Sequence, residues 1–161
     1  MKVLITGATS GIGQQLVADY ACEGHNVIAC GRNADALKKL ADEFPDYVET
    51  LQFDTVDRDK TIELLGSINQ IDVAILSAGV CEYLDIESFD AELFERVFTV
   101  NVQGTMNCVQ GLLRTLQPGS KLVLVGSLAR LLPFTRAQAY GGSKAAIHYI
   151  SRSLEVDLAP K

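Results

Sequence analysis

Residues 3–13 read Val3-Leu4-Ile5-Thr6-Gly7-Ala8-Thr9-Ser10-Gly11-Ile12-Gly13, and this stretch decides the fold of the chain. A short apolar run opens it and predicts a buried strand, and the glycine-rich turn that follows leads into a helix. Backbone amides in such a turn, together with the positive end of the helix dipole, are placed to hold a diphosphate. The stretch therefore predicts a phosphate-binding strand–turn–helix unit.

The glycines of this turn have a spacing of their own. In the G-x-G-x-x-G fingerprint the last glycine would fall at Leu16, and a Walker loop would need a Gly-Lys-Ser/Thr that does not follow. A glycine-rich turn that binds no ligand is the alternative interpretation. The position directly after the first strand favours phosphate binding.

Short apolar runs alternate with helix-length segments along the rest of the chain. Such runs are typical of parallel strands whose two faces are covered by helices. We therefore expect a single domain, residues 1–161, with a doubly wound three-layer α/β/α fold and five parallel strands. The expected strands are 3–5, 27–29, 48–53, 73–76 and 122–125, and the expected helices are 12–23, 34–44, 58–66, 89–116 and 139–158.

Composition and charge narrow the class of protein. The chain has 161 residues, of which 48% are hydrophobic and 21% charged, as in an ordinary globular domain. Its net charge of -6 disfavours a nucleic-acid partner, which needs a basic face, and fits a small-molecule ligand better. The first apolar run is too short for a signal-peptide core and no run reaches membrane-spanning length. We expect a cytoplasmic protein with no membrane partner.

The chain contains four cysteines, Cys22, Cys30, Cys81 and Cys108, without a C-x-x-C pair. They lie in or beside apolar segments, so we expect buried thiols rather than disulfides. The same spacing predicts no metal site.

The end of the second expected strand reads Cys30-Gly31-Arg32-Asn33 and bears on the choice of nucleotide. An acidic residue at this point of a dinucleotide-binding unit bonds the adenosine ribose, whereas an arginine can pair with a 2′-phosphate. Arg32 therefore favours NADP(H) over NAD(H). The alternative is that Arg32 is a solvated turn residue before a helix capped by Asn33.

Tyr140 and Lys144 are four residues apart on an expected helix and therefore share one face. A tyrosine is a poor base at neutral pH because its ordinary pKa is about 10, and a neighbouring ammonium stabilises the phenolate. A Tyr-x-x-x-Lys pair alone is a weak signal, since most such pairs are surface contacts.

Together these motifs resemble the short-chain dehydrogenase/reductase family, whose T-G-x-x-x-G-x-G pattern the turn matches at every fixed position. The resemblance covers residues 1 to about 160 and implies a Rossmann-like fold. Two departures stand out. Ser77 replaces an asparagine of the family's Asn-Asn-Ala-Gly, and the family's C-terminal strands, from the sixth onward, do not follow Lys161. We expect either a fragment of a longer protein or a natural truncation.

The resemblance implies a role for each matching residue. Ser127, thirteen residues before Tyr140 as in the family, would hold the substrate oxygen while Tyr140 donates or takes the proton. Lys144 would bind the nicotinamide ribose, and Asn101 would hold a water that links Lys144 to solvent. A plain helix-kinking role is the alternative for Asn101. The implied cofactor-binding residues are Gly7, Thr9, Ser10, Gly11, Ile12, Gly13, Arg32, Asn33, Asp54, Ala78, Gly79, Asn101, Tyr140 and Lys144.

Two of these positions concern the adenosine end. Gly31 occupies the place where NAD-preferring members of the family carry an acid. Asp54, which opens Asp54-Thr55-Val56-Asp57, looks like the acid that meets the adenine ring. An ordinary loop acid is the alternative for Asp54.

The sequence thus predicts an NADP(H)-dependent oxidoreductase that moves a hydride between the nicotinamide and a carbonyl or alcohol substrate, with Tyr140 as acid/base. A catalytically silent nucleotide-binding regulator or scaffold of the same fold is the alternative, motivated by the missing C-terminal region. Epimerase or dehydratase chemistry on a nucleotide sugar is disfavoured, because relatives with that chemistry usually have a different glycine spacing.

The expected helix 89–116 carries two apolar stripes, whereas a surface helix normally needs one. We expect it to cover the sheet and also to meet a second helix or another subunit, and the resemblance implies a homodimer or homotetramer built on it. Burial within one thick domain is the alternative. The stripes are Phe89, Leu93, Val97 and Val100, and Phe94, Phe98, Val102, Val109 and Leu113.

Overall fold

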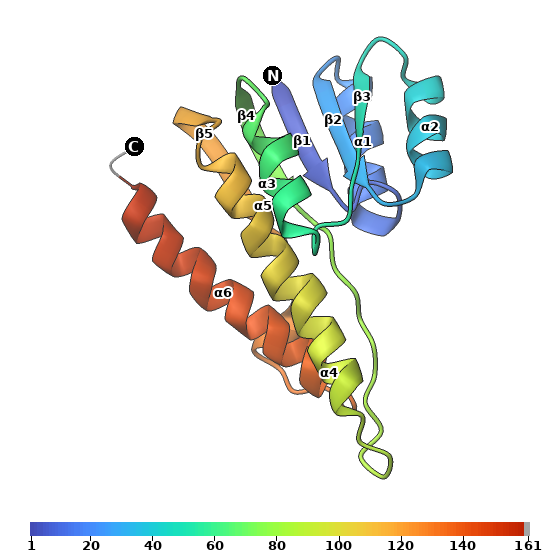
Figure 1. Ribbon diagram of the computed structural model, residues 1–161, viewed down its shortest axis with the longest axis vertical. Helices are drawn as coiled ribbons and strands as arrows, with labels where there is room; N and C mark the ends of the chain where they lie inside the picture. Colours follow the sequence, from blue (N-terminus) through green and yellow to red (C-terminus); the bar gives the residue numbers. More distant parts are fainter. Residues whose placement is uncertain (160–161) are drawn as a thin grey trace.

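The computed structural model describes residues 1–159 and shows strands that alternate with helices (Figure 1). The strands are β1 (Lys2–Thr6), β2 (Asn26–Gly31), β3 (Val48–Gln52), β4 (Ile71–Leu76) and β5 (Leu116–Leu124). The helices are α1 (Gly11–Cys22), α2 (Ala34–Glu43), α3 (Arg58–Gly66), α4 (Ala91–Phe98), α5 (Thr105–Leu112) and α6 (Gln138–Leu158). A π-helical turn, Thr99–Gly104, joins α4 to α5, and a 3₁₀ turn, Leu128–Arg130, follows β5.

The five strands are all parallel and lie in the order β3-β2-β1-β4-β5. The direction of winding reverses at β1, because β2 and β3 lie on one side of it and β4 and β5 on the other. In such a sheet the ligand crevice opens beyond the carboxyl ends of the strands at the reversal, here β1 and β4. The predicted doubly wound fold with five parallel strands is confirmed.

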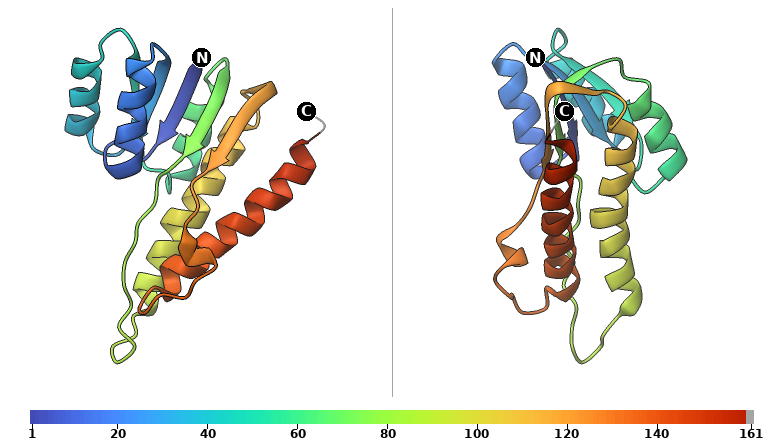
Figure 2. Two further views of the ribbon diagram at one scale, coloured as in Figure 1. Left: turned by 180° about the vertical axis from the view of Figure 1, so that it is seen from behind. Right: turned by 90° about the vertical axis from the view of Figure 1, so that its left-hand side faces the viewer.

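Two apolar clusters fill the space between the sheet and its helices. On one face, α1 and α2 pack on strand residues that include Val3 and Ile5. On the other face, α3 and α5 pack on residues that include Leu4 and Ile28. Figure 2 shows α1 and α3 on opposite sides of the sheet. Because both faces are covered, β1 is buried from Val3 to Thr6 without alternation.

The segment predicted as one helix, 89–116, is interrupted and ends earlier. Its hydrogen bonding widens to the π-helical turn, in which Gly104 packs so closely that a Cβ there would lie 2.6 Å from Thr55 Oγ1. The helix ends at Leu112, and Leu116 already pairs with Ile71 in the sheet.

β5 begins before the predicted 122–125 because its pairing with β4 contains an irregularity. Leu116 pairs with Ile71, but the next pair joins Lys121 to Val73. Ser120 Oγ donates to the Ile71 carbonyl at 2.7 Å and accepts from Gln117 N at 3.0 Å. The residues of this bulge are polar, so a search for apolar runs did not find the start of the strand.

The two apolar stripes of the long helix meet different partners. Val97 is buried with Leu84 and with Ala139 of α6, so a second helix of the same chain covers part of the surface. Val109 belongs to the cluster beneath the sheet, whereas Phe89 and Leu113 are exposed. The oligomeric state stays a prediction.

Two of the four cysteines lie where the sequence did not place them. Cys22 and Cys81 are exposed, so the prediction of burial is wrong for this pair. Cys30 and Cys108 are buried, and burial raises the pKa of the Cys108 thiol to about 12. Cys81 is exposed because it follows β4 in a loop that borders the crevice.

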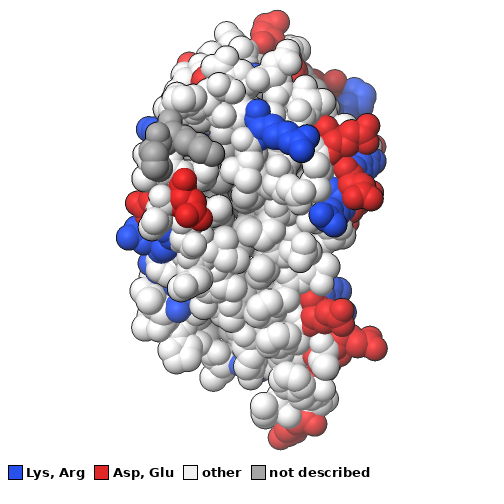
Figure 3. Space-filling model, turned by 60° about the vertical axis from the view of Figure 1, so that its left-hand side comes forward, with Lys and Arg blue, Asp and Glu red and all other residues white. Residues whose placement is uncertain are grey.

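The surface carries mixed charge. On the face drawn in Figure 3, Lys and Arg side chains are interspersed with Asp and Glu rather than gathered in a continuous stripe. None of the helices within residues 1–159 is long and apolar enough to cross a membrane.

The first turn of α1 supplies a test of the backbone packing. A Cβ on Gly13 would lie 2.3 Å from the Gly7 carbonyl oxygen. We expect Gly13→Ala to lower the free energy of unfolding by about 1–3 kcal/mol, the usual cost of forcing atoms into a packed site. Urea unfolding followed by circular dichroism measures the change. Gly126→Ala is the control, because a Cβ there meets nothing within 4 Å. Equal stability of the two variants would contradict the expectation.

Candidate active site

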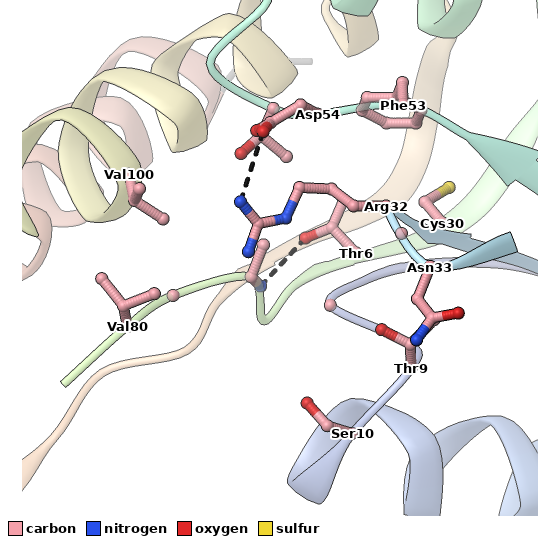
Figure 4. Close-up of a pocket in the computed structure, with 15 residues that line it drawn as sticks. Thr6, Thr9, Ser10, Cys30, Arg32, Asn33, Phe53, Asp54, Val80 and Val100 are labelled. Atoms are coloured by element: carbon pink, nitrogen blue, oxygen red, sulfur yellow. Dashed lines mark hydrogen bonds and ion pairs between the residues drawn. The ribbon is translucent and has the colours of Figure 1, made fainter. Parts of the chain in front are cut away.

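The carboxyl ends of the strands surround one cleft. One end of it is lined from the β1 turn and from the residues that follow β2, β3 and β4, as Figure 4 shows. A second hollow continues toward α6 and shares Gly7, Ser10, Gly79 and Val80 with the first. Tyr140, Lys144 and Cys81 line that second hollow. The structure thus brings the glycine-rich turn and the Tyr140–Lys144 pair to the same cleft.

Hydrogen bonds to backbone groups at the end of β2 and just after β4 hold the glycine-rich turn in place. Thr6 Oγ1 accepts hydrogen bonds from Ser77 N at 3.1 Å and Ala78 N at 3.2 Å, and Ala8 N donates to the Cys30 carbonyl at 3.0 Å. Gly7 has a φ of 67°, and a Cβ there would lie 2.9 Å from Ala78 Cα. These contacts fix the turn at β1 relative to the ends of β2 and β4, with Ser77 bound through its backbone.

Arg32 and Asp54 meet at the end of the cleft that lies beyond β2 and β3. Arg32 Nη1 lies 3.3 Å from Asp54 Oδ2, and the Arg32 side chain is 65% exposed. Gln52 Nε2 donates to the Arg32 carbonyl at 3.1 Å. Asn33 Oδ1 caps α2 by accepting from Ala36 N, which confirms the helix cap that the sequence placed there. Both residues predicted to meet the adenosine therefore line one pocket and contact each other.

Tyr140 and Lys144 lie on α6 with the geometry that their spacing predicts. Lys144 Nζ is 5.9 Å from the centroid of the Tyr140 ring and donates to the Val125 carbonyl at 2.8 Å. The side chain is almost enclosed, with Lys144 7% exposed. Burial lowers the pKa of the Lys144 ammonium from its ordinary value, and the negative charge of a Cys81 thiolate would oppose that shift.

Ser127 begins the 3₁₀ turn that follows β5. Its Oγ accepts a hydrogen bond from Ala129 N at 3.1 Å, which leaves the hydroxyl proton free for another acceptor. The same turn packs against the first turn of α6, because a Cβ on Gly141 would lie 3.1 Å from the Ala129 carbonyl oxygen. Val125 and Gly126, the two residues before Ser127, line the cleft. Ser127 itself is not among the lining residues.

Asn101 bridges three elements from within the π-helical turn. It is 1% exposed, its Oδ1 accepts from Val80 N at 2.7 Å, and its Nδ2 donates to the Val80 carbonyl at 2.9 Å and to Ser143 Oγ at 3.0 Å. The helix is irregular at this residue, and π-helical turns often accompany functional sites. The side chain is engaged by protein groups, and the water-holding role stays a prediction.

Ser143 was not identified from the sequence as part of the site. Its Oγ donates to the Tyr140 carbonyl at 2.7 Å while it accepts from Asn101, so it links α6 to the π-helical turn. Its position before Lys144 was the only available signal, and a serine that bonds the preceding turn of its own helix has no distinctive spacing. Cys81 was also missed, because a cysteine beside apolar residues predicts burial.

Asn101 supplies a test of this bridge. Asn101→Asp keeps the acceptor for Val80 N but removes the donor to the Val80 carbonyl and Ser143. We expect the free energy of unfolding at pH 8 to fall by about 1–3 kcal/mol. A buried carboxyl facing a carbonyl has a raised folded-state pKa, so the loss should shrink at pH 5, where the group is closer to neutral.

Urea unfolding at both pH values checks the Asn101→Asp expectation. Ser143→Ala is the matched control, because Asn101 Nδ2 then keeps its bond to Val80, and its loss should be smaller and independent of pH. A pH-independent loss in Asn101→Asp would contradict the assigned donor role.

Comparison with known proteins gives the following matches. The sequence profile described as short chain dehydrogenase matches residues 1–161. The NADP-dependent 3-hydroxy acid dehydrogenase YdfG of Salmonella typhi is 30% identical over 98% of this chain and 66% of its own length. An uncharacterized oxidoreductase of Staphylococcus epidermidis is 28% identical over 97% of this chain and 70% of its own. The chain thus spans roughly two thirds of the length of these relatives.

Solved structures have the same arrangement. Serine dehydrogenase from Escherichia coli has a TM-score of 0.89 and 30% identity, covering 98% of this chain and 76% of that one. A closed form of serine dehydrogenase complexed with NADP+ gives the same TM-score and identity, over 66% of its chain. A short-chain dehydrogenase from Streptomyces avermitilis has a TM-score of 0.91 at 27% identity, over 99% of this chain and 61% of that one.

Proposed function

The chain belongs to the short-chain dehydrogenase/reductase family, and from that premise we propose that it is an NADP(H)-dependent oxidoreductase, which moves a hydride between the nicotinamide and a carbonyl or alcohol carbon. The observation that carries the proposal is one cleft with the phosphate-binding turn and Arg32 at one end and Tyr140 and Lys144 at the other. A small-molecule substrate fits the family, and we propose the cytoplasm as the location.

The turn between β1 and α1 fits a diphosphate. Gly11 has a φ of 51°, and a Cβ there would meet nothing within 4 Å, so its backbone faces open space. Ser10 is the N-cap of α1 but makes no side-chain cap bond, which leaves the first amides of a 12-residue helix available to an anion. Gly7 and Gly13 would complete the cradle, with Thr9 and Ile12 beside it.

Arg32 supports the preference for NADP(H). Its guanidinium pairs with Asp54 in an exposed contact, which contributes little because both charges stay partly solvated. A 2′-phosphate carries more charge and accepts two bonds from a guanidinium, so it would compete with Asp54 for Arg32. Two similar proteins are named for NADP, the 3-hydroxy acid dehydrogenase and the serine dehydrogenase complex.

The other end of the cleft provides the proton chemistry. NADPH, when bound, supplies the hydride for a carbonyl carbon. The Tyr140 hydroxyl gives its proton to the carbonyl oxygen during reduction and takes it back during oxidation. Lys144 stabilises the phenolate by its charge, and the bond to Val125 holds its ammonium in place. The free hydroxyl proton of Ser127 would bind the substrate oxygen.

We infer a homodimer or homotetramer as the assembly. Large apolar side chains stay exposed on both long helical segments, with Tyr149 and Val156 of α6 77% and 74% exposed and Leu113, just past α5, 47% exposed. Burial of these side chains against another subunit would remove apolar surface from water.

Tyr140→Phe tests the assigned acid/base. We expect turnover of ketones or aldehydes, followed by the loss of NADPH absorbance, to fall by at least about 100-fold, because proton transfer is removed. The Kd for NADPH should change little. Tyr149→Phe, an exposed tyrosine on the same helix, is the control and should keep full activity. Tight NADPH binding by the wild type with no reduction of any carbonyl would instead support a nucleotide-binding regulator.

Arg32→Ala tests the nucleotide preference. Loss of a charge-assisted hydrogen bond to the 2′-phosphate should weaken NADPH binding by about 1.5–3 kcal/mol and leave NADH binding nearly unchanged. Isothermal titration with both nucleotides measures this. Arg152→Ala, which removes an exposed arginine from α6, should alter neither Kd. Equal weakening of NADPH and NADH binding would contradict the role of Arg32 in binding the 2′-phosphate.

A further inference from the structure

Thr9 and Gly31 are in steric contact at the adenosine end of the cleft. A Cβ built on Gly31 would lie 2.8 Å from Thr9 Cγ2 and 3.3 Å from Thr9 Oγ1. Gly31 is absent from the positive-φ residues, so its backbone conformation does not require a glycine. The glycine is therefore required by its neighbour rather than by its own conformation.

Thr9 is held firmly in this position. Its turn is tied to β2 by the bond from Ala8 N to the Cys30 carbonyl, one residue away from each partner of the contact. A threonine is also stiff about χ1, because two heavy atoms on Cβ restrict its rotamers. The backbone of Thr9 is therefore fixed beside Gly31, and the stiffness of χ1 opposes rotation of the methyl group away from it.

This contact bears on how a nucleotide is chosen. An acid at the end of the second strand recognises the ribose hydroxyls of NAD, and its side chain would begin in the volume that the Thr9 methyl fills. We propose that Thr9 is a specificity-determining residue, which keeps position 31 free of a side chain and so selects a 2′-phosphorylated adenosine. The inference rests on the proposed function.

The Thr9 hydroxyl adds an attractive component to this exclusion. Within residues 1–159 it takes part in no side-chain hydrogen bond, although Thr9 is half-buried and lines the pocket with Arg32 and Asn33 (Figure 4). It can donate to a phosphate oxygen beside Arg32. Specificity then combines the exclusion of an acidic side chain from position 31 with a bond to the 2′-phosphate.

Unfolding without nucleotide tests the contact. Gly31→Ala should lower the equilibrium constant for folding by about tenfold, as overpacking does. Thr9→Ser removes the offending methyl and should restore most of that loss in the double variant. Thr9→Val keeps a branched side chain of the same shape and should restore nothing. Neutral Gly31→Ala, or equal rescue by serine and valine, would overturn the steric argument.

Nucleotide titration tests the specificity. In the Thr9→Ser background, Gly31→Asp should shift the ratio of the NADPH and NADH dissociation constants toward NADH by at least about tenfold. Gly31→Asp alone should shift it less, because Thr9 blocks the carboxylate. An equal shift in both backgrounds would overturn the role of Thr9. A wild type that binds neither nucleotide would overturn the proposed function and the specificity role together, while the unfolding results would still decide the contact.

Discussion

The close approach of three backbone segments at the carboxyl ends of β1 and β4 is the constraint on which the cleft depends. Gly13 sits against the Gly7 carbonyl, and Gly7 sits against Ala78, with no side chain between them. This packing brings the start of α1 and the turn after β4 within reach of one ligand. A side chain at either glycine would push the glycine-rich turn away from the start of α1 or from the loop that carries Gly79.

A second set of contacts orients α6, the helix that carries Tyr140 and Lys144. Lys144 bonds the end of β5 through Val125, and Asn101 bonds both the loop after β4 and Ser143. These bonds fix the position of Tyr140 relative to the ends of β4 and β5, and not only relative to its own helix. These buried polar groups are satisfied, since no enclosed side-chain nitrogen or oxygen among the described residues lacks a partner. A satisfied network of this kind rigidifies a site.

The sequence predicted what depends on local pattern. The apolar runs placed all five strands, and the spacing of Tyr140 and Lys144 predicted that their side chains meet. Features that depend on long-range contact escaped it. The early start of β5 follows from a bulge opposite Ile71, and the π-helical turn sits where Gly104 packs against Thr55, 49 residues earlier in the chain. Neither partner carries a local signal of the other.

The contact of Arg32 with Asp54 keeps the guanidinium beside the pocket, and it is weak enough for a ligand to replace. Asp54 keeps other bonds, because its Oδ1 accepts from Val56 N at 3.2 Å and its backbone carbonyl accepts from Thr61 Oγ1 at 3.1 Å. It therefore stays in place if Arg32 turns away. The contact between the two charges is partly exposed and contributes at most about 1 kcal/mol, so the proposed 2′-phosphate would replace it at small cost. Arg32 is in this way kept near the pocket by an interaction weak enough to yield.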